Sequence, residues 1–383
     1  MRWCFSGSIE SQNPKTGFVH SEGAMMRLRH IDRMRAVAIL CMVEVHTAAI
    51  LPPEGVTVGH PAAFVAAAFG GMAAPMFVTI SGWGMYRSAS RRVSEGHSTV
   101  QWTSWIIPRV ALLCLCQLLV NLLLNVERGG RFEWHTPGVL TLLAISAALC
   151  PALVRISALN RSLGMLLFGI SPLLLGNLSE PDLGWFERVD AGSIEEWISR
   201  LLFSGTYPLV PWIFFILLGT VLHDLRVDTS IRERGVVLGI LATSVTLAYS
   251  VVEGIDWALT SGEAVLTFFP ASMPFLIVSG TMVALSLRVL EGDEESGGEP
   301  FMGDGLSFLE PAGRLSLTIY VAHFAILGVV ALLMEGEPRL ALVSAFFATI
   351  SHTLVWIPLA ILHERTIPWF SLERMLRLSQ SSK

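Results

Sequence analysis

Arg35 and His46 stand eleven residues apart in one apolar segment, 33–52. In an α-helix this spacing is three turns plus roughly 20°, with a rise of about 16 Å, so both side chains share one helix face. Such a stripe could hold an anionic group at the arginine and carry out proton chemistry at the histidine. The alternatives are an arginine that anchors the helix end at the membrane surface and a histidine that makes a polar contact between helices.

Two carboxylates belong to the same segment. Asp32 lies beside Arg35 at the expected cytoplasmic mouth, whereas Glu44 points about 160° away from His46. Glu44 could be a general base or a proton relay, or it could be paired with a residue on another helix. The sequence leaves these two readings equal.

Two further histidines are candidates. His60 directly precedes Pro61, which suits the first position of a helix. The positive end of that helix would disfavour imidazolium and leave the neutral imidazole that a base or acyl acceptor needs; an exposed loop histidine is the plainer alternative. His323 follows Tyr320 by three residues, and a buried hydrogen bond between them would explain both. His352 and His363 are interpreted as structural or interfacial.

The elements that position these residues must be membrane helices. Of the 383 residues, 52% are hydrophobic and only 15% are charged, and the mean hydropathy is +0.60. This composition argues against a soluble enzyme and a disordered chain, and the net charge of −5 argues against a nucleic-acid binder. The sequence has no metal-ligand spacing such as HExxH, so we expect no metal.

We predict an all-α, polytopic transmembrane bundle of about ten spans. Each predicted span is a run of about 20 apolar residues. The runs are 33–52, 61–86, 103–125, 138–155, 162–178, 207–223, 235–252, 264–288, 315–334 and 340–363. Arginine-rich loops alternate with arginine-poor ones, which places both termini in the cytoplasm.

The predicted organisation has one membrane domain, 31–365, between two cytoplasmic tails. The tails are a flexible segment at 1–30 and a second one at 366–383. The acidic, glycine-rich stretch 291–299 is interpreted as a solvated linker without chemistry.

Four stretches resemble integral-membrane acyltransferases. Residues 29–46 are similar to an opening in which an Asp, then an Arg, is followed by ten residues and a His, and PMFVTISG at 75–82 resembles a second-helix signature. YPLVPW at 207–212, followed by Leu218-Gly219, resembles the heparan-α-glucosaminide N-acetyltransferase branch. GRLSLTIYVAH at 313–323 resembles a late motif shared by that branch and the acyltransferase-3 branch.

The resemblance implies acyl-CoA bound from the cytoplasm and an acceptor at the outer face. The essential histidine matches His46 in the acyltransferase-3 branch and His60 in the N-acetyltransferase branch, so the choice stays open with a slight preference for His60. The acyl-CoA site at the cytoplasmic mouth would include four basic residues that meet the CoA phosphates: Arg35, Arg91, Arg92 and Arg109. Asp32 would be part of the same site. The supporting residues that the motifs name are Ser81, Tyr207, Trp212, Tyr320 and His323.

The sequence thus predicts an acyl-CoA-dependent N- or O-acetyltransferase in the cell membrane. Acetyl-CoA would be the co-substrate, and a sugar or glycan the acceptor. The other partners expected are membrane lipid and no nucleic acid, with a homodimer left open. The main rival is a secondary transporter, although Pro270 and Pro274 have no counterpart in a second repeat. A catalytically inactive scaffold is a third reading.

Overall fold

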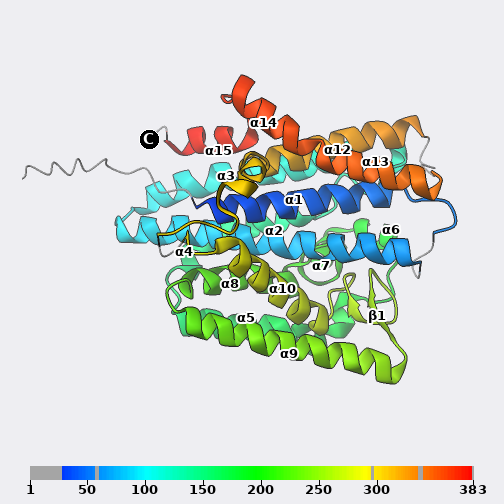
Figure 1. Cartoon of the computed structure of the whole chain (residues 1–383), viewed down its shortest axis with the longest axis horizontal. Helices are drawn as coiled ribbons and strands as arrows, with labels where there is room; N and C mark the ends of the chain where they lie inside the picture. Colours follow the sequence, from blue (N-terminus) through cyan, green and yellow to red (C-terminus); the bar gives the residue numbers. More distant parts are fainter. Residues whose placement is uncertain (1–27, 57–59, 295–296, 335–339, 382–383) are drawn as a thin grey trace, which may run out of the picture.

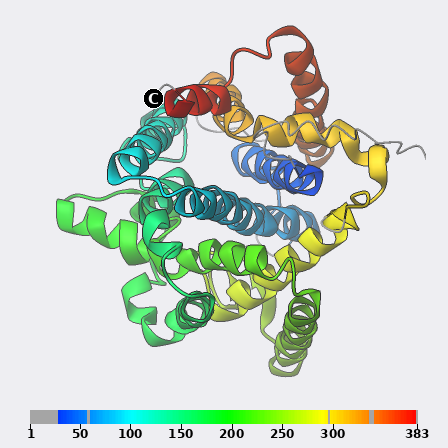
Figure 2. The same cartoon turned by 90° about the vertical axis from the view of Figure 1, so that its left-hand side faces the viewer.

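A computed structural model describes residues 28–56, 60–294, 297–334 and 340–381. Its long helices run side by side (Figure 1). α1 (Arg29–Ile50) packs along α2 (Pro61–Ser94), and α2 packs in turn along α8 (Leu209–Asp224). Seen along the bundle, α1 and α2 lie at its centre with the other helices around them (Figure 2). The segment that carries Arg35 and His46 is therefore an interior helix.

Within the described parts of the chain, eight further helices surround this centre and four short ones lie at its ends. The surrounding helices are α3 (Thr99–Leu123), α4 (Val139–Leu153), α5 (Ala158–Leu174), α9 (Thr229–Glu253), α10 (Met273–Glu291), α12 (Ser316–Leu333), α13 (Leu342–Leu354) and α14 (Trp356–Thr366). The short ones are α6 (Trp185–Val189), α7 (Ile194–Ser199), α11 (Glu310–Arg314) and α15 (Leu372–Ser381). Several begin at a side-chain cap: Ser98 and Gln101 form a capping box on α3, and Ser272 caps α10.

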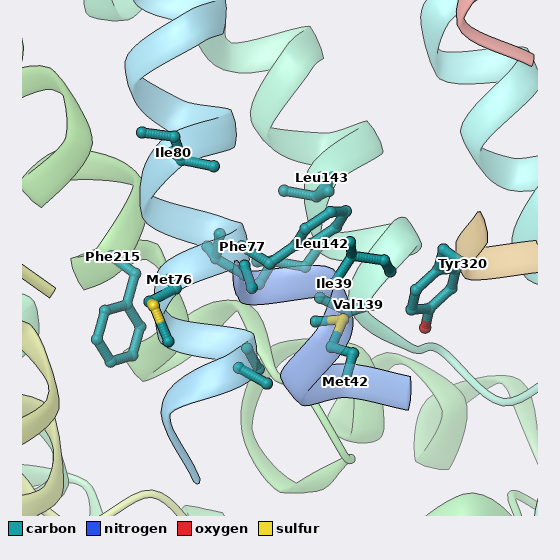
Figure 3. Close-up of a cluster of buried hydrophobic side chains, with 14 of the residues drawn as sticks. Ile39, Met42, Met76, Phe77, Ile80, Val139, Leu142, Leu143, Phe215 and Tyr320 are labelled. Carbon is teal, nitrogen blue, oxygen red and sulfur yellow. The ribbon is translucent and has the colours of Figure 1, made fainter. Parts of the chain in front are cut away.

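The core consists of apolar side chains from α1, α2, α4 and α8. Ile39, Met42 and Phe77 are buried between α1 and α2, and Leu142 from α4 closes the cluster beside them (Figure 3). By contrast, α9 exposes large apolar side chains along its length: Val237, Leu238, Leu241, Val245 and Val252. An apolar interior and an apolar exterior together are typical of a helix bundle whose solvent is lipid.

Except for 264–288, each predicted span coincides with helix over most of its length. Five helical stretches among the described residues are long and apolar enough to cross a membrane: α3, α9, α10, α12 and the continuous stretch Leu342–Thr366. A sixth arises if Ile194–Ser204 and α8, which meet at a 44° bend, count as one span. The all-α, polytopic class is confirmed at this level, and ten spans remain a prediction.

Two segments differ from the sequence prediction. The span predicted over 264–288 starts as a strand: β2 (Ala264–Thr267) pairs in parallel with β1 (Asp256–Leu259), and α10 begins only at Met273. A proline at the first or second helical position favours this late start, because its missing N–H has no helical partner there to lose. The loop predicted over 179–206 holds the short helices α6 and α7.

The acidic stretch 291–299 is not simply solvated, which corrects its interpretation as a linker. The Glu291 carboxylate lies 2.7 Å from the Arg232 guanidinium, and both side chains are at most 5% exposed. The Glu294 carboxylate binds the start of α1. These partners lie far away in sequence, so the local composition of the stretch gave no sign of them. The tail predicted over 1–30 lies outside the described residues up to residue 27.

Candidate active site

His46 lies in the second half of α1, where it meets α12. Its Nδ1 is 2.9 Å from Nε2 of His323, and the two imidazole rings are nearly parallel, at 7°. The Phe324 ring packs at 4.6 Å from His46, centroid to centroid. The helix stripe predicted from the sequence thus ends in a histidine pair, which sequence spacing could not reveal because 277 residues separate its members.

The hydrogen bonds of this pair determine which nitrogens carry protons. His323 Nδ1 lies 3.1 Å from the Ile319 carbonyl oxygen, which can only accept, so this nitrogen is the donor. In a neutral His323, Nε2 is then an acceptor and the His46 Nδ1–H must donate to it. A neutral His46 consequently carries its lone pair on Nε2, the form that a general base requires.

Tyr320 lies beside this pair without forming the predicted hydrogen bond. The Tyr320 and His323 rings are 5.6 Å apart and edge to face, and the polar atoms of His323 bond to His46 and Ile319 instead. Tyr320 stacks on Phe77 of α2 at 6.0 Å. Tyr320 and His323 share a face of α12 because they are three residues apart. Both ring nitrogens of His323 already have partners, so none is left for the Tyr320 hydroxyl.

Tyr207 and Trp212 form an aromatic wall next to α10. Their rings meet edge to face at 4.9 Å, and Trp212 is fully buried. The Tyr207 hydroxyl is within electrostatic reach of the Tyr320 hydroxyl. The structure therefore brings the predicted supporting residues Tyr207, Trp212 and Tyr320 to the same region of the core.

A third histidine, His352 of α13, approaches from the other side of α1. Its Nδ1 lies 2.8 Å from the Thr47 hydroxyl oxygen. The Thr47 hydroxyl itself donates its proton to the Val43 carbonyl oxygen. His352 Nδ1 must therefore donate, and its buried Nε2 has no hydrogen-bond partner among the described residues. The sequence predicted only a structural or interfacial role for His352. Its position beside Thr47 depends on packing between α1 and α13, which no sequence motif indicates.

The other two catalytic candidates stand apart from this pair. Glu44 lies on a different face of α1, and its buried Oε2 has no hydrogen-bond partner within the described parts of the chain. Among the described residues, the structure thus shows no hydrogen bond that would pair Oε2 with another helix. His60 is half-buried in the loop immediately before α2. The contacts that hold His46 come from α12.

At the opposite end of α1, three arginines converge. The Arg92 guanidinium lies 4.4 Å from the Trp105 ring centroid, and the Arg109 guanidinium lies 5.4 Å from the same ring. The positive charges of Arg35 and Arg92 both act on Arg109, whose buried Nε has no hydrogen-bond partner among the described residues. Several positive charges around an N–H donor that has no partner form a site suited to an anion.

The remaining two predicted mouth residues take different positions. Asp32 is buried, and its carboxylate lies 3.7 Å from the Arg35 guanidinium. Arg91 is exposed and pairs with Glu95 one helical turn away. Asp32 therefore accompanies the arginine group, whereas Arg91 lies at its surface edge.

Ser81 belongs to a close helix crossing. A Cβ on its neighbour Gly82 would stand 2.7 Å from the Ile216 carbonyl oxygen, and one on Gly219 would stand 2.2 Å from the Thr79 carbonyl oxygen. Only glycine fits between α2 and α8 at these points. The two motifs that contain Ser81-Gly82 and Leu218-Gly219 therefore describe a single contact.

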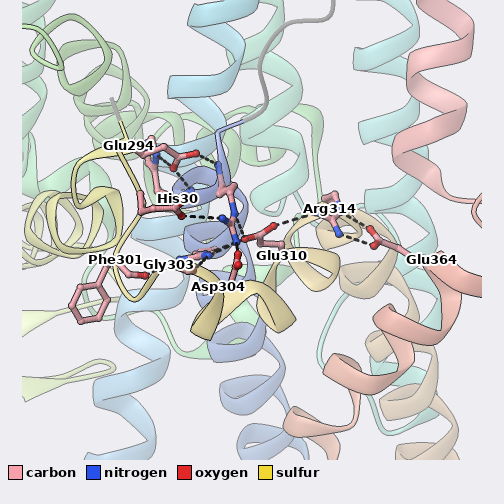
Figure 4. Close-up of polar contacts among 11 residues, drawn as sticks. His30, Glu294, Phe301, Gly303, Asp304, Glu310, Arg314 and Glu364 are labelled. Atoms are coloured by element: carbon pink, nitrogen blue, oxygen red, sulfur yellow. Dashed lines mark hydrogen bonds and ion pairs between the residues drawn. The ribbon is translucent and has the colours of Figure 1, made fainter. Parts of the chain in front are cut away.

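The first turn of α1 is fixed by hydrogen bonds to the loop after α10 and to α11. The fully buried Arg33 donates to the carbonyl oxygens of Phe301 and Gly303, at 2.7 and 2.5 Å, and to Glu310 (Figure 4). Glu294 accepts hydrogen bonds from the backbone N–H and the ring of His30. This network holds α1, and with it Arg35, in position.

The late motif contributes a glycine at the same place. A Cβ on Gly313 of α11 would stand 1.8 Å from the Asp32 carbonyl oxygen, so α11 lies directly against the first turn of α1. Among the described residues, no group of three His, Cys, Asp or Glu side chains is placed to hold a metal ion.

Fold and site together define an integral membrane protein with a hydrogen-bonded histidine pair, half-buried His46 and buried His323, towards one end of its central helix and grouped arginines towards the other. The model of the acyltransferase-3 family, described as an acyltransferase domain, matches residues 28–360. The chain therefore belongs to the acyltransferase-3 family, and membrane acyltransferase activity is the function this membership supports. The match does not favour a transporter. No curated protein matches the sequence.

Proposed function

We propose that this protein moves an acyl group, acetyl by the sequence resemblance, from acyl-CoA to a hydroxyl or amine of a sugar or glycan. The CoA phosphates would lie at Arg35, Arg92 and Arg109, and the thioester would reach His46. The helical rise between Arg35 and His46, about 16 Å, is a distance that the extended pantetheine arm of CoA can span. The coincidence of an anion site and a base on one helix face supports this arrangement.

In the proposed reaction His46 acts as the general base. Its Nε2 takes the proton of the acceptor hydroxyl or amine while the acceptor oxygen or nitrogen bonds to the thioester carbon. The carbon–sulfur bond then breaks, and the proton passes from His46 Nε2 to the departing CoA sulfur. His323 accepts the His46 Nδ1–H throughout and stabilises the imidazolium that forms in between.

The observation that carries the proposal is the hydrogen-bonded chain from Ile319 through His323 to His46, since it leaves the His46 lone pair available. Family membership adds support, because His46 matches the histidine of the acyltransferase-3 opening. The earlier preference for His60 stays a competing prediction. Catalysis from the cytoplasmic to the outer face, in the cell membrane, is part of the proposal.

The test is transfer of radiolabelled acetyl from acetyl-CoA to a panel of amino sugars and glycans by protein in lipid nanodiscs. His46→Ala should lower the rate by about 10²- to 10⁴-fold, the contribution of a positioned base. His60→Ala should retain activity, and His97→Ala, a surface histidine paired with Glu95, is the matched control. An inactive His60→Ala beside an active His46→Ala would overturn the assignment.

A further inference from the structure

Two tyrosine hydroxyls lie in the region of His46, and the reaction described above does not use them. Tyr320 belongs to α12, and its ring centroid is 6.4 Å from that of His46. Tyr207 lies two residues before the start of α8, and its hydroxyl is within electrostatic reach of the Tyr320 hydroxyl. Segments more than a hundred residues apart in the sequence thus bring two phenols together beside the base.

Aromatic packing holds both tyrosine rings in place. Tyr320 lies at the edge of the buried apolar cluster (Figure 3), where it stacks on Phe77 at 6.0 Å and meets Phe324 edge to face at 5.2 Å. Tyr207 meets Trp212 edge to face at 4.9 Å. Because neighbouring rings confine each tyrosine ring, the positions of the two hydroxyl oxygens are set before any substrate arrives.

Neither hydroxyl serves the fold as a hydrogen-bonding group. Among the described residues, the hydroxyl oxygens of Tyr207 and Tyr320 have no hydrogen-bond partner, and neither oxygen is completely enclosed by protein. The same is true of His46 Nε2, whereas His46 Nδ1 is committed to His323. A base and two hydroxyl donors, each still accessible, therefore lie in one region of the core.

Acyl transfer from a thioester needs donors of this kind. The carbonyl oxygen becomes an oxyanion when the acceptor bonds to the carbonyl carbon, and a negative charge in an apolar core is costly unless donors point at it. The neighbouring Phe77 and Phe324 rings have no N–H or O–H group. A tyrosine phenol is protonated at neutral pH and can donate its O–H to an oxyanion.

The separation of Tyr320 from His46 fits this chemistry. A base lies about 2.6–3.2 Å from the acceptor atom that it deprotonates, and that atom approaches the reacting carbon to about 3–3.5 Å. The thioester carbonyl would therefore react within about 6 Å of His46 Nε2. The Tyr320 ring, 6.4 Å from the His46 ring, borders this volume.

We propose that Tyr320 and Tyr207 are catalytic residues whose hydroxyls donate hydrogen bonds to the thioester carbonyl oxygen and form the oxyanion hole of the transfer. As the acceptor atom bonds to the carbonyl carbon, the π electrons of C=O move to the oxygen, where both hydroxyls stabilise the charge. As they return, the carbon–sulfur bond breaks, and CoA leaves with the proton from His46. This role rests on the proposed function.

Tyr320→Phe and Tyr207→Phe each remove one hydroxyl and keep the ring. With full-length protein in nanodiscs, acetyl-CoA and the best acceptor of the panel, each variant should lower kcat by about 10²- to 10³-fold, the effect of losing one oxyanion donor. The KM for acetyl-CoA should not change, because the donors act mainly on the transition state. Tyr249→Phe is the matched control and should keep the wild-type kcat, since Tyr249 is 52% exposed on α9.

Infrared spectroscopy measures the same contact without turnover. Acetyl-CoA labelled with carbon-13 in its thioester carbonyl is bound to the nanodisc protein in the absence of acceptor. Hydrogen bonds polarise the carbonyl, so its band should lie at lower frequency in the wild type than in a variant that combines Tyr207→Phe and Tyr320→Phe. Side chains that only pack against their neighbours would leave this band where it is.

Three results would overturn the inference. The first is a wild-type kcat in both single variants. The second is a raised KM for the acceptor with unchanged kcat, which would assign the hydroxyls to acceptor binding. The third is a lowered kcat with an unmoved carbonyl band, which would show an effect through packing. Unchanged unfolding temperatures establish that the variants are folded. A band that shifts in a wild-type protein without acetyl transfer would count against the proposed function alone.

Discussion

A histidine in a membrane helix becomes a base only if something fixes its tautomer. In this chain the fixing group is His323, whose own Nδ1–H is committed to the Ile319 carbonyl. The arrangement places a neutral imidazole where a carboxylate stands in many hydrolases. It therefore positions the proton without placing a second charge in the apolar core, where an isolated charge is costly.

His323 should accordingly act as a positioning residue. His323→Ala leaves the His46 ring free to turn, and misplacement of a catalytic group by about 1 Å can cost roughly a hundredfold in rate. We expect kcat to fall by this order with little change in KM for acetyl-CoA. His323→Gln, whose amide oxygen can accept the His46 proton, should recover part of the loss. Equal kcat for His323→Ala and wild type would contradict the role.

The arginine group makes a prediction about binding rather than rate. Arg109→Ala or Arg35→Ala should weaken acetyl-CoA binding by about tenfold to a hundredfold, since a charge-assisted hydrogen bond contributes about 1.5–3 kcal/mol. Isothermal titration of the detergent-solubilised protein measures this. Arg128→Ala is the control, because Arg128 is exposed at the other end of the bundle. Unchanged acetyl-CoA affinity in both Arg109→Ala and Arg35→Ala would show that the CoA phosphates do not bind at this site.

Between elements, the α2–α8 crossing determines where these groups lie. Gly82→Ala forces a methyl group against the Ile216 carbonyl oxygen, and such overpacking costs about 1–3 kcal/mol of unfolding free energy. Gly71→Ala, on the same helix with no atom within 4 Å of the added Cβ, should be neutral or stabilising. Thermal unfolding in nanodiscs compares the two, and equal melting temperatures would refute the close crossing.

The attachment of α1 to the loop after α10 should depend on pH. Burial alone would raise the pKa of Glu294, but hydrogen bonds from His30 and Arg29 outweigh it and leave the pKa below its ordinary value of 4.5. A carboxylate with a lowered pKa in the folded state stabilises the protein above its unfolded pKa and loses that effect as pH falls through the folded value.

Glu294→Gln tests this attachment. Above pH 4.5 the variant should melt below wild type, and the gap should close as the pH is lowered below 4.5 and through the lowered pKa of Glu294, because the wild-type carboxylate then becomes neutral as well. Melting curves across this range measure the gap. Asp293→Asn, an exposed neighbour, is the matched control. A gap independent of pH would show that the charge of Glu294 does not hold α1.

The sequence predicted the positions of the helices better than the contacts between them. Apolar runs located the helices because burial in lipid or core dictates them locally, and helix periodicity placed Arg35 and His46 on one face. The start of α10 was misplaced because β2 is apolar too. The His46–His323 pair and the contacts of Arg33 join residues more than 260 positions apart, and the Arg232–Glu291 pair joins residues 59 apart; no single-sequence pattern encodes such contacts.

For the whole molecule, the direction of transfer depends on which end faces the cytoplasm. The arginine group and the His46 cluster lie towards opposite ends of α1, so a spanning orientation would put the arginine group near one membrane surface and His46 near the other. The alternation of arginine-rich and arginine-poor loops predicts that the arginine end faces the cytoplasm. The short helices α6 and α7 and strand β1 then cover the outer end (Figure 1).

Cysteine accessibility in intact cells tests this orientation. In a background without native cysteines, Glu95→Cys reports the arginine end and Glu127→Cys the end near His46, since both residues are exposed. A membrane-impermeant maleimide should label position 127 in whole cells, and position 95 only after the membrane is opened. Since the proposed donor is cytoplasmic acyl-CoA, the reverse pattern would place the arginine group on the side opposite to that donor. The donor would then have to enter from the His46 end, and the proposed path along α1 would be wrong.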